Sequence, residues 1–229
     1  MQTLFGSILT KKKKRKKETP AKTVHSSHSF FLANWFGSDI AIDLGTTNII
    51  VYVRKKGIVV NEPAVIALDT NSHRVVAIGK EAQAMLGRTP QHIQAYHPLS
   101  RGVIADYDAT EYMLRYFIRR AIGKSLFFKP RIIICVPSGA TNVEKRAVIE
   151  AAMQAGARKT VVMEEPLAAA IGAGLDVASS NGSMVVDMGG GTTDVAVLSL
   201  SGIVISESLR IGSNTFDEAI IRYLEKIKH

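Results

Sequence analysis

Short apolar runs that alternate with polar positions begin near residue 39, a pattern typical of β-strands. Turn signals such as RKKG and NEP separate the runs. The pattern predicts four strands in succession, at 40–43, 49–54, 58–60 and 64–68. Strands joined by turns alone indicate a meander rather than a strand–helix–strand start.

Helical spacing begins after a mixed segment at 69–99, and two buried-type strands follow it. Residues 108–123 place apolar side chains on one helix face, namely Met113, Leu114, Phe117, Ile118 and Ile122. Buried strands are predicted at 131–136 and 160–164. Helices are predicted at about 141–155, where Thr141 and Asn142 signal the start, and at 166–174, where Pro166 opens an Ala-rich run.

One pattern occurs twice along the chain. SDIAIDLGTTNIIVYV at 38–53 and SMVVDMGGGTTDVAVLSL at 183–200 each contain an apolar strand, an aspartate, a bend of small residues and a second apolar strand. The aspartates are Asp43 and Asp187. A duplicated hairpin indicates two related domains that each present one bend to a shared cleft.

The residues of these bends suit a phosphate site. Gly189, Gly190 and Gly191 let backbone amides approach an anion, and Thr192 and Thr193 add hydroxyl donors. Asp43 and Asp187 suit a hydrated Mg²⁺, because this ion binds few carboxylates and keeps several waters. Alternatively, the glycines and threonines of both bends only form tight turns that the aspartates cap, and no phosphate binds there. The same arrangement in both hairpins favours a phosphate site, and neither bend is a P-loop, because no GK[ST] follows.

A nucleotide hydrolase also needs a group that orients the attacking water. Glu164 and Glu165 lie where the strand at 160–164 meets the Ala-rich helix, at the expected mouth of the cleft. The same acids would also be favourable at a helix N-terminus without any catalytic role. Spacing alone leaves both interpretations open.

Composition limits the function classes. The chain has 229 residues, 46% of them hydrophobic, so it can form a substantial core. The net charge is +9, but the run KKKKRKK at 11–17 carries most of it and leaves about +2 for the remainder. No nucleic-acid partner is therefore expected. Cys135 is the only cysteine, which excludes an internal disulfide and fits a cytoplasmic protein.

Several motifs, found in the same order along the chain, resemble those of the actin-like ATPases and, within them, of the bacterial shape-determining MreB family. They are DLGTTN at 43–48, VPSGATNVEKRA at 136–147, EEPLAAAIGAGLDV at 164–177 and DMGGGTTD at 187–194. The heat-shock chaperone ATPases share two of these motifs, but a larger lobe separates their first motif from the VP segment. The resemblance covers about 38–229.

The resemblance implies an α/β fold of duplicated actin-like (ribonuclease H-like) domains. The expected divisions are an arm at 1–38, a first domain at 39–174 with a small subdomain inserted at 67–99, and an incomplete second domain at 175–229. Because the family continues beyond the position of His229, the chain is expected to be a fragment or truncated product. Tight ATP binding and unaided polymerisation are not expected of such a chain.

The resemblance also assigns roles around ATP and Mg²⁺. Phosphate contacts are implied for the two bends, at Thr46, Thr47, Asn48, Gly190, Gly191 and Thr192, beside the Gly189 amide. Asp43 and Asp187 are implied near the metal through water. Glu165, rather than Glu164, matches the position that activates water, and Thr192 matches its helper.

Membrane attachment is implied by two apolar segments. FFLANWF contains Phe30, Phe31, Leu32, Trp35 and Phe36, and SLFFKP contains Phe127 and Phe128. Each buried large apolar side chain contributes roughly 1.5–3 kcal/mol, and two membrane signals together give stable attachment. Packing of 30–36 on the protein's own core is the alternative.

The function implied is a cytoskeletal ATPase whose filaments lie on the inner face of the cell membrane, guide cell-wall synthesis and maintain rod shape. Its expected partners are further copies of the chain, the membrane surface, and proteins of cell-wall synthesis and division. The alternatives are a non-catalytic remnant that binds only membrane or a partner, and a chaperone-type ATPase domain.

Overall fold

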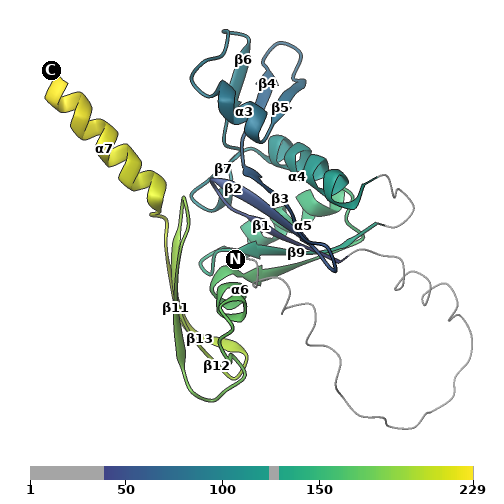
Figure 1. Ribbon diagram of the computed structural model, residues 1–229, viewed down its shortest axis with the longest axis vertical. Coiled ribbons are helices and arrows are strands. Elements are labelled where there is room, and N and C mark those ends of the chain that lie inside the picture. The colour runs from purple at the N-terminus through teal and green to yellow at the C-terminus, as the bar shows by residue number, and fades with distance from the viewer. Residues whose placement is uncertain (1–38, 124–128, 229) are drawn as a thin grey trace, which may run out of the picture.

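The computed structural model describes residues 39–123 and 129–228, in which helices pack against a central sheet and smaller separate sheets (Figure 1). The central sheet has the strand order β10-β9-β1-β2-β3. Its strands are β1 (Asp39–Leu44), β2 (Asn48–Val53), β3 (Gly57–Pro63), β9 (Arg131–Val136) and β10 (Lys159–Glu164). The first three strands are antiparallel, as the meander predicts, whereas β9 pairs parallel to both β1 and β10.

Helices cover both faces of the central sheet. The helices α4 (Tyr107–Ile122) and α5 (Asn142–Gln154) pack on one face. The predicted apolar stripe of α4 is buried there, with Met113, Leu114 and Phe117 fully inaccessible. The other face contacts α6 (Glu165–Gly172), where Ala168 packs against Ala41 and Ile50. Both faces of β1 are therefore buried, which explains its nearly continuous apolar sequence.

A capping box begins α5. The Thr141 hydroxyl accepts a hydrogen bond from the Glu144 amide at 3.2 Å, and the Glu144 carboxylate accepts one from the Thr141 amide at 2.7 Å. Two of the amides at this helix end are thereby satisfied by side chains.

Replacing Thr141 with alanine is expected to lower the free energy of unfolding by about 0.5–2 kcal/mol, because the first turn of α5 loses its cap. Urea unfolding followed by circular dichroism measures this change. Thr141→Ser keeps the hydroxyl and serves as the matched control. Equal stability of the alanine and serine variants would contradict the role of the cap.

A second, smaller sheet lies above the central one (Figure 1). It has the order β5-β4-β6 and carries one short helix. Its elements are β4 (Ile66–Asp69), β5 (Val75–Ile78), α3 (Lys80–Met85) and β6 (Ile93–Tyr96), and the short hairpin β7 (Leu99–Ser100) with β8 (Val103–Ile104) follows. Val65, Ala67 and Ala82 form its own small core. Glu62 on β3 ties it to the body, because its carboxylate pairs with Arg120 of α4 and accepts from the Lys80 amide.

The duplicated hairpin belongs to a third sheet of order β11-β12-β13, which α6 separates from the central sheet (Figure 1). Its strands are β11 (Ser183–Met188), β12 (Thr193–Ser199) and β13 (Gly202–Leu209). Ala196 and Leu198 are buried against Ala170 of α6. The other face leaves Met184 and Val186 more than half exposed.

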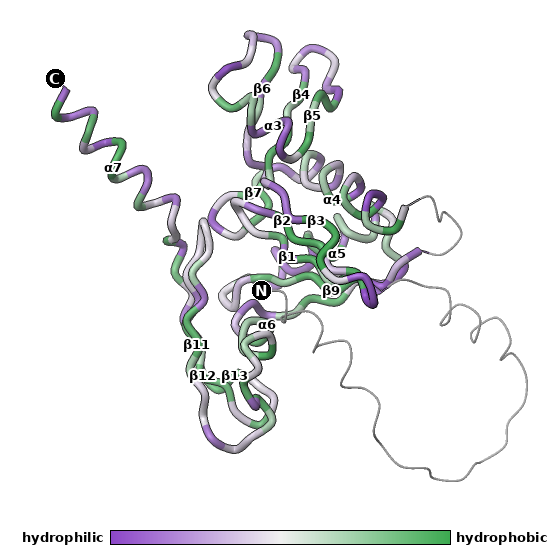
Figure 2. Tube along the Cα trace, in the orientation of Figure 1, coloured by the Kyte–Doolittle hydropathy of each residue, from purple (hydrophilic) through white to green (hydrophobic). Residues whose placement is uncertain are grey.

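The last helix, α7 (Ser213–Lys228), projects away from the rest of the molecule (Figure 1). None of its described side chains is buried. Hydrophobic and hydrophilic residues follow one another along it at helical spacing (Figure 2). Phe216, Ile220 and Leu224 are each more than half exposed.

Two predicted features lie outside the described residues: the arm at 1–38, with its apolar segment 30–36, and the pair Phe127 and Phe128. Within the described part of the chain, no helix combines the length and the apolar character that a membrane crossing requires.

Candidate functional site

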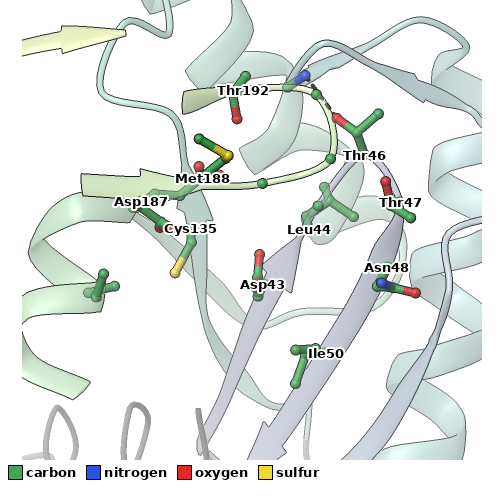
Figure 3. A pocket seen from close by; sticks show the side chains of 18 of the residues that line it. Asp43, Leu44, Thr46, Thr47, Asn48, Ile50, Cys135, Asp187, Met188 and Thr192 are labelled. Carbon is green, nitrogen blue, oxygen red and sulfur yellow. Dashed lines mark hydrogen bonds between the residues drawn. The ribbon is translucent and has the colours of Figure 1, made fainter. Parts of the chain in front are cut away.

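The bend between β1 and β2 lies directly against the glycine-rich bend between β11 and β12 (Figure 3). A methyl group on Gly190 would overlap the Thr47 hydroxyl and lie 2.9 Å from Thr47 Cβ. One on Gly191 would lie 2.5 Å from Thr46 Oγ1. Glycine is therefore needed at both positions, because a side chain would push the bends apart.

Both bends line one cavity of about 330 Å³. The structure brings together around it these residues to which the sequence assigns catalytic, nucleotide-binding or metal roles: Asp43, Thr46, Thr47, Asn48, Glu165, Asp187, Gly189, Gly190, Gly191 and Thr192. Thr193, the other threonine expected to donate to a phosphate, is not among the lining residues, and its hydroxyl donates to the Ile211 carbonyl at 2.8 Å. They come from three parts of the chain, namely the two hairpins and the start of α6. A cavity of this size accommodates a small ligand.

Hydrogen bonds fix the threonines of the first bend. The Gly102 amide donates to Thr46 Oγ1 at 3.0 Å, and the Thr47 hydroxyl donates to Asn214 Oδ1 at 3.3 Å. The Asn214 amide in turn donates to the Gly190 carbonyl at 3.0 Å. The start of α7 therefore holds both bends at once.

Three carboxyl groups face this cavity from three different elements. Burial raises the pKa of Asp43 to about 6, and the Asp187 carboxylate adds to the shift. Burial raises the pKa of Glu165 to about 9, and Asp43, Asp194 and Asp187 add to it in that order. Burial, followed by Asp194, also raises the pKa of Asp187. Burial is the main cause of all three shifts, and neighbouring carboxylates add to each of them.

This acidic set fits a hydrated cation. None of the described residues that line the cavity is Lys or Arg. In the described ranges no group of three or more His, Cys, Asp and Glu is placed to bind a metal directly. Asp43 and Asp187 could therefore hold a Mg²⁺ that keeps its own waters, which is the binding mode this ion prefers.

The structure also separates the two neighbouring glutamates. Glu165 lines the cavity, whereas Glu164 Oε1 pairs with Lys145 Nζ of α5 at 3.0 Å. Only Glu165 is therefore placed to contact a ligand in this cavity.

Sequence reasoning missed several residues at or beside the site, and four of them are singled out by polar groups, a thiol or a bond to the first bend. Asn61, Gly102 and Cys135 line the cavity, and Asp194 is buried next to it at 1% exposure. Cys135 is buried as the apolar run around it predicts, but its place in the cavity wall follows only from the pairing of β9 with β1. Asp194 had a signal, because an acid within the apolar alternation of β12 falls on a buried face.

The Glu165 carboxyl makes stability depend on pH. The folded protein keeps this proton up to about pH 9, whereas the unfolded chain releases it near the ordinary value of 4.5. The folded state binds more protons between these limits, so the free energy of unfolding is expected to fall as pH rises from about 5 to 9.

Thermal unfolding at several pH values measures this dependence in the ligand-free protein. Glu165→Gln removes the titrating group, so its melting temperature is expected to change less with pH than that of the wild type. Glu164→Gln is the matched control, because that carboxyl does not line the cavity. A Glu165→Gln variant as sensitive to pH as the wild type would refute the assignment.

Comparison with known proteins gives a consistent result. The family model described as MreB/Mbl protein matches residues 37–229. The cell shape-determining protein Mbl of Bacillus cereus is 50% identical over 191 residues, which are 83% of this chain and 57% of that protein. The cell shape-determining protein MreB of Haemophilus influenzae is 53% identical over 196 residues, with 83% and 56% covered. The chain thus spans little more than half the length of these relatives.

Solved structures agree with the expected fold. MreB5 of Spiroplasma citri, crystallised with ADP and with AMPPNP, superposes with a TM-score of 0.77 at 35% identity, over 83% of this chain and 57% of that one. A MamK double helical filament superposes with a TM-score of 0.66 at 22% identity, over 82% and 59%, and supports the fold alone. The actin-like α/β fold expected from the sequence is confirmed, and the chain belongs to the MreB/Mbl family.

Proposed function

We propose that this chain carries the phosphate-binding part of an MreB-type cytoskeletal ATPase, which binds ATP with Mg²⁺ between its two bends. The observation that carries the proposal is the contact of the two bends around a single acidic cavity. The nucleotides in the Spiroplasma citri structures add support. Nothing in the family match favours the chaperone alternative.

Each bend would contribute donors to the phosphates. Backbone amides at Gly189, Gly190 and Gly191 can approach phosphate oxygens, because no Cβ stands in the way. Hydroxyl groups of Thr46, Thr47 and Thr192 and the Asn48 amide would add side-chain donors. Thr46 can donate while it keeps its present bond, because its oxygen only accepts from the Gly102 amide. Thr47 would first have to release Asn214 Oδ1, because a hydroxyl has a single proton to donate.

Asp43 and Asp187 would hold Mg²⁺ through water, and the bound ion would neutralise phosphate charge. Glu165 lies at the start of α6, on the wall of the same cavity, and would orient the attacking water toward the terminal phosphate. Thr192 would assist it from the second bend. The raised pKa of Glu165 means that its carboxyl is protonated in the empty site at neutral pH. It would therefore have to lose this proton before it could accept another from water.

The same proposal includes the domain division and the cellular role. Residues 39–174 would form the first domain, with 67–99 as an inserted subdomain, and 175–229 would begin the second. The separate sheets of the two hairpins support this division. Filaments of many copies would lie on the inner face of the cell membrane, guide cell-wall synthesis and maintain rod shape. The names of the relatives, cell shape-determining proteins, support the role in cell shape alone.

Titration with a fluorescent ATP analogue tests the nucleotide site. Saturable binding is expected in the presence of Mg²⁺, with competition by unlabelled ATP and ADP, and weaker binding after EDTA is added. A folded protein, as judged by a cooperative thermal transition, that does not bind the analogue at any accessible concentration would exclude the site in this chain.

Sedimentation with anionic vesicles tests the membrane role of the segments at 30–36 and 126–128. Phe30→Ser combined with Trp35→Ser is expected to release the chain into the supernatant. Val76→Ser is the matched control, because Val76 is an exposed apolar residue of β5. Equal sedimentation of the double variant and the control would refute attachment through 30–36.

A further inference from the structure

Asp194 is a buried acid whose position the proposed nucleotide contacts do not explain. It lies on β12, is 1% exposed, and is not among the residues that line the cavity. Its register partner in the hairpin is Asp187 on β11. Directly opposite residues on antiparallel strands have neighbouring side chains, and like charges placed so are unfavourable. A compensating contact is therefore expected at Asp194.

That contact is with Ser138. Asp194 Oδ1 accepts a hydrogen bond from the Ser138 amide at 2.8 Å and a second from the Ser138 hydroxyl at 2.6 Å. Ser138 follows β9 of the central sheet, whereas Asp194 belongs to the third sheet. The pair thus connects the two sheets that carry the two bends.

The second carboxylate oxygen of Asp194 indicates that burying this side chain reduces the stability of the fold. Asp194 Oδ2 is buried, and no hydrogen-bond partner for it exists in the described part of the chain. A buried carboxylate oxygen without a partner reduces stability, and hydrogen bonds from a charged acceptor recover part of the cost. An apolar residue at this position would fill the same space without this loss of stability.

The contact sits beside the glycine-rich bend. Thr192 precedes Asp194 by two residues, Pro137 precedes Ser138, and both lie close to Gly102. A methyl group on Gly102 would lie 2.6 Å from Thr192 Cγ2 and 2.8 Å from Pro137 Cγ. The Gly102 amide in turn donates to Thr46 of the first bend. Gly102 therefore connects the segment after β9 with both bends, because it lies next to Pro137 and Thr192 and bonds to Thr46.

We propose that Asp194 is a positioning residue, which binds Ser138 and thereby holds the glycine-rich bend against the first bend. It acts through the placement of the bend and does not itself contact the ligand. The functional part of this inference rests on the proposed nucleotide site, whereas the structural part can be measured in the empty protein.

A second link, between the end of the third sheet and a helix of the central sheet, provides a matched control. Arg210, just after β13, pairs with Glu144 of α5 at 2.9 Å, and the Arg210 side chain is about half exposed. Loss of this pair in Arg210→Met removes that link and keeps the printed hydrogen bonds of both bends. An effect shared by Ser138→Ala and Arg210→Met would reflect general loosening, whereas an effect of Ser138→Ala alone reflects the proposed contact.

Amide hydrogen exchange in the nucleotide-free protein is the first measurement. Ser138→Ala and Asp194→Ala are each expected to speed exchange of the amides at 189–193 by about tenfold, the loss expected for one charged hydrogen bond. Arg210→Met is expected to leave them unchanged. Unchanged exchange at 189–193 in Ser138→Ala would overturn the inference, whether or not the chain binds nucleotide.

Affinity for the fluorescent ATP analogue is the second measurement. Each single variant is expected to bind about tenfold more weakly, and the double variant no more weakly than Asp194→Ala alone, because that substitution already removes both hydrogen bonds to Ser138. Ser138→Thr keeps the hydroxyl and is expected to restore most of the affinity. Normal affinity in both alanine variants would overturn the inference. A wild type that fails to bind, with exchange as expected, would remove the proposed nucleotide site and leave the positioning of the bend in place.

Discussion

Replacing Gly190 with alanine is expected to lower the free energy of unfolding by about 1–3 kcal/mol and to weaken nucleotide binding by about 10–100-fold. The new methyl group would overlap the Thr47 hydroxyl. The two bends must move apart to make room for the methyl group. The same two bends would bind the phosphates of one nucleotide, so their separation also weakens binding. Both losses therefore have the same steric cause.

Denaturant unfolding and titration with the fluorescent ATP analogue measure the two effects. Gly182→Ala is the control for both, because a methyl group there would lie at an ordinary 3.5 Å from Val197 Cγ1 and outside the cavity. Gly189→Ala is a further control for stability, with its methyl group 3.6 Å from the Thr192 carbonyl oxygen. Loss of stability in all three variants would point to the flexibility of glycine rather than to the contact with Thr47.

Replacing Glu165 with alanine is expected to slow ATP hydrolysis by about 10²–10⁴-fold, the usual contribution of a positioned acid–base group. Nucleotide binding is expected to remain nearly intact. The side chain would contact water rather than phosphate, and its carboxyl is uncharged in the empty site at neutral pH, so its removal does not change the charge of the site that the nucleotide enters. The effect should therefore fall on turnover and not on affinity.

Single-turnover hydrolysis and nucleotide titration separate these quantities. Because the chain spans 57% of its Mbl relative, the assay uses both the 229-residue chain and a chimaera completed with the C-terminal part of a curated MreB relative. Glu164→Gln is the control, since Glu164 pairs with Lys145 instead of lining the cavity. Unchanged turnover in Glu165→Ala, or an equal loss in Glu164→Gln, would remove the assignment.

The strands and the two hairpins could be predicted because their signals are local. The apolar run 131–136 is the strand β9 as the structure has it, and the α4 stripe of Met113, Leu114 and Phe117 is buried as its spacing predicts. Alternation and helical spacing follow from which face of an element is buried, so they are readable without the partner element.

The smaller sheet was harder to predict for the same physical reason. The strand expected at 64–68 corresponds to β4, but β5 and β6 have only four residues each and parts of them are exposed, so their alternation is too short to separate strand from loop. The sequence therefore presents 69–99 as a mixed segment. Its α3 helix is similarly short and begins without a side-chain cap.

The contacts between distant segments could not be predicted from the pattern at all. Thr47 meets Asn214, and Ser138 meets Asp194, across sheets that are separate in the chain. Repetition of the hairpin predicts that two bends share a cleft, but it does not predict which hydroxyl faces which glycine. Likewise, spacing left Glu164 and Glu165 as equal candidates, whereas the structure places Glu165 on the cavity wall and pairs Glu164 with Lys145.

The attachment of α7 gives this helix the properties of a lever. The Ser213 and Asn214 amides donate to the Gly189 and Gly190 carbonyls of the glycine-rich bend, and none of the described side chains further along is buried. Sixteen helical residues extend about 24 Å, so a rotation of about 10° at the bend would carry Lys228 through about 4 Å. A small rotation of the glycine-rich bend at the cavity would thus become a larger displacement at the C-terminal end of α7, and exposed apolar side chains such as Leu224 would move with it.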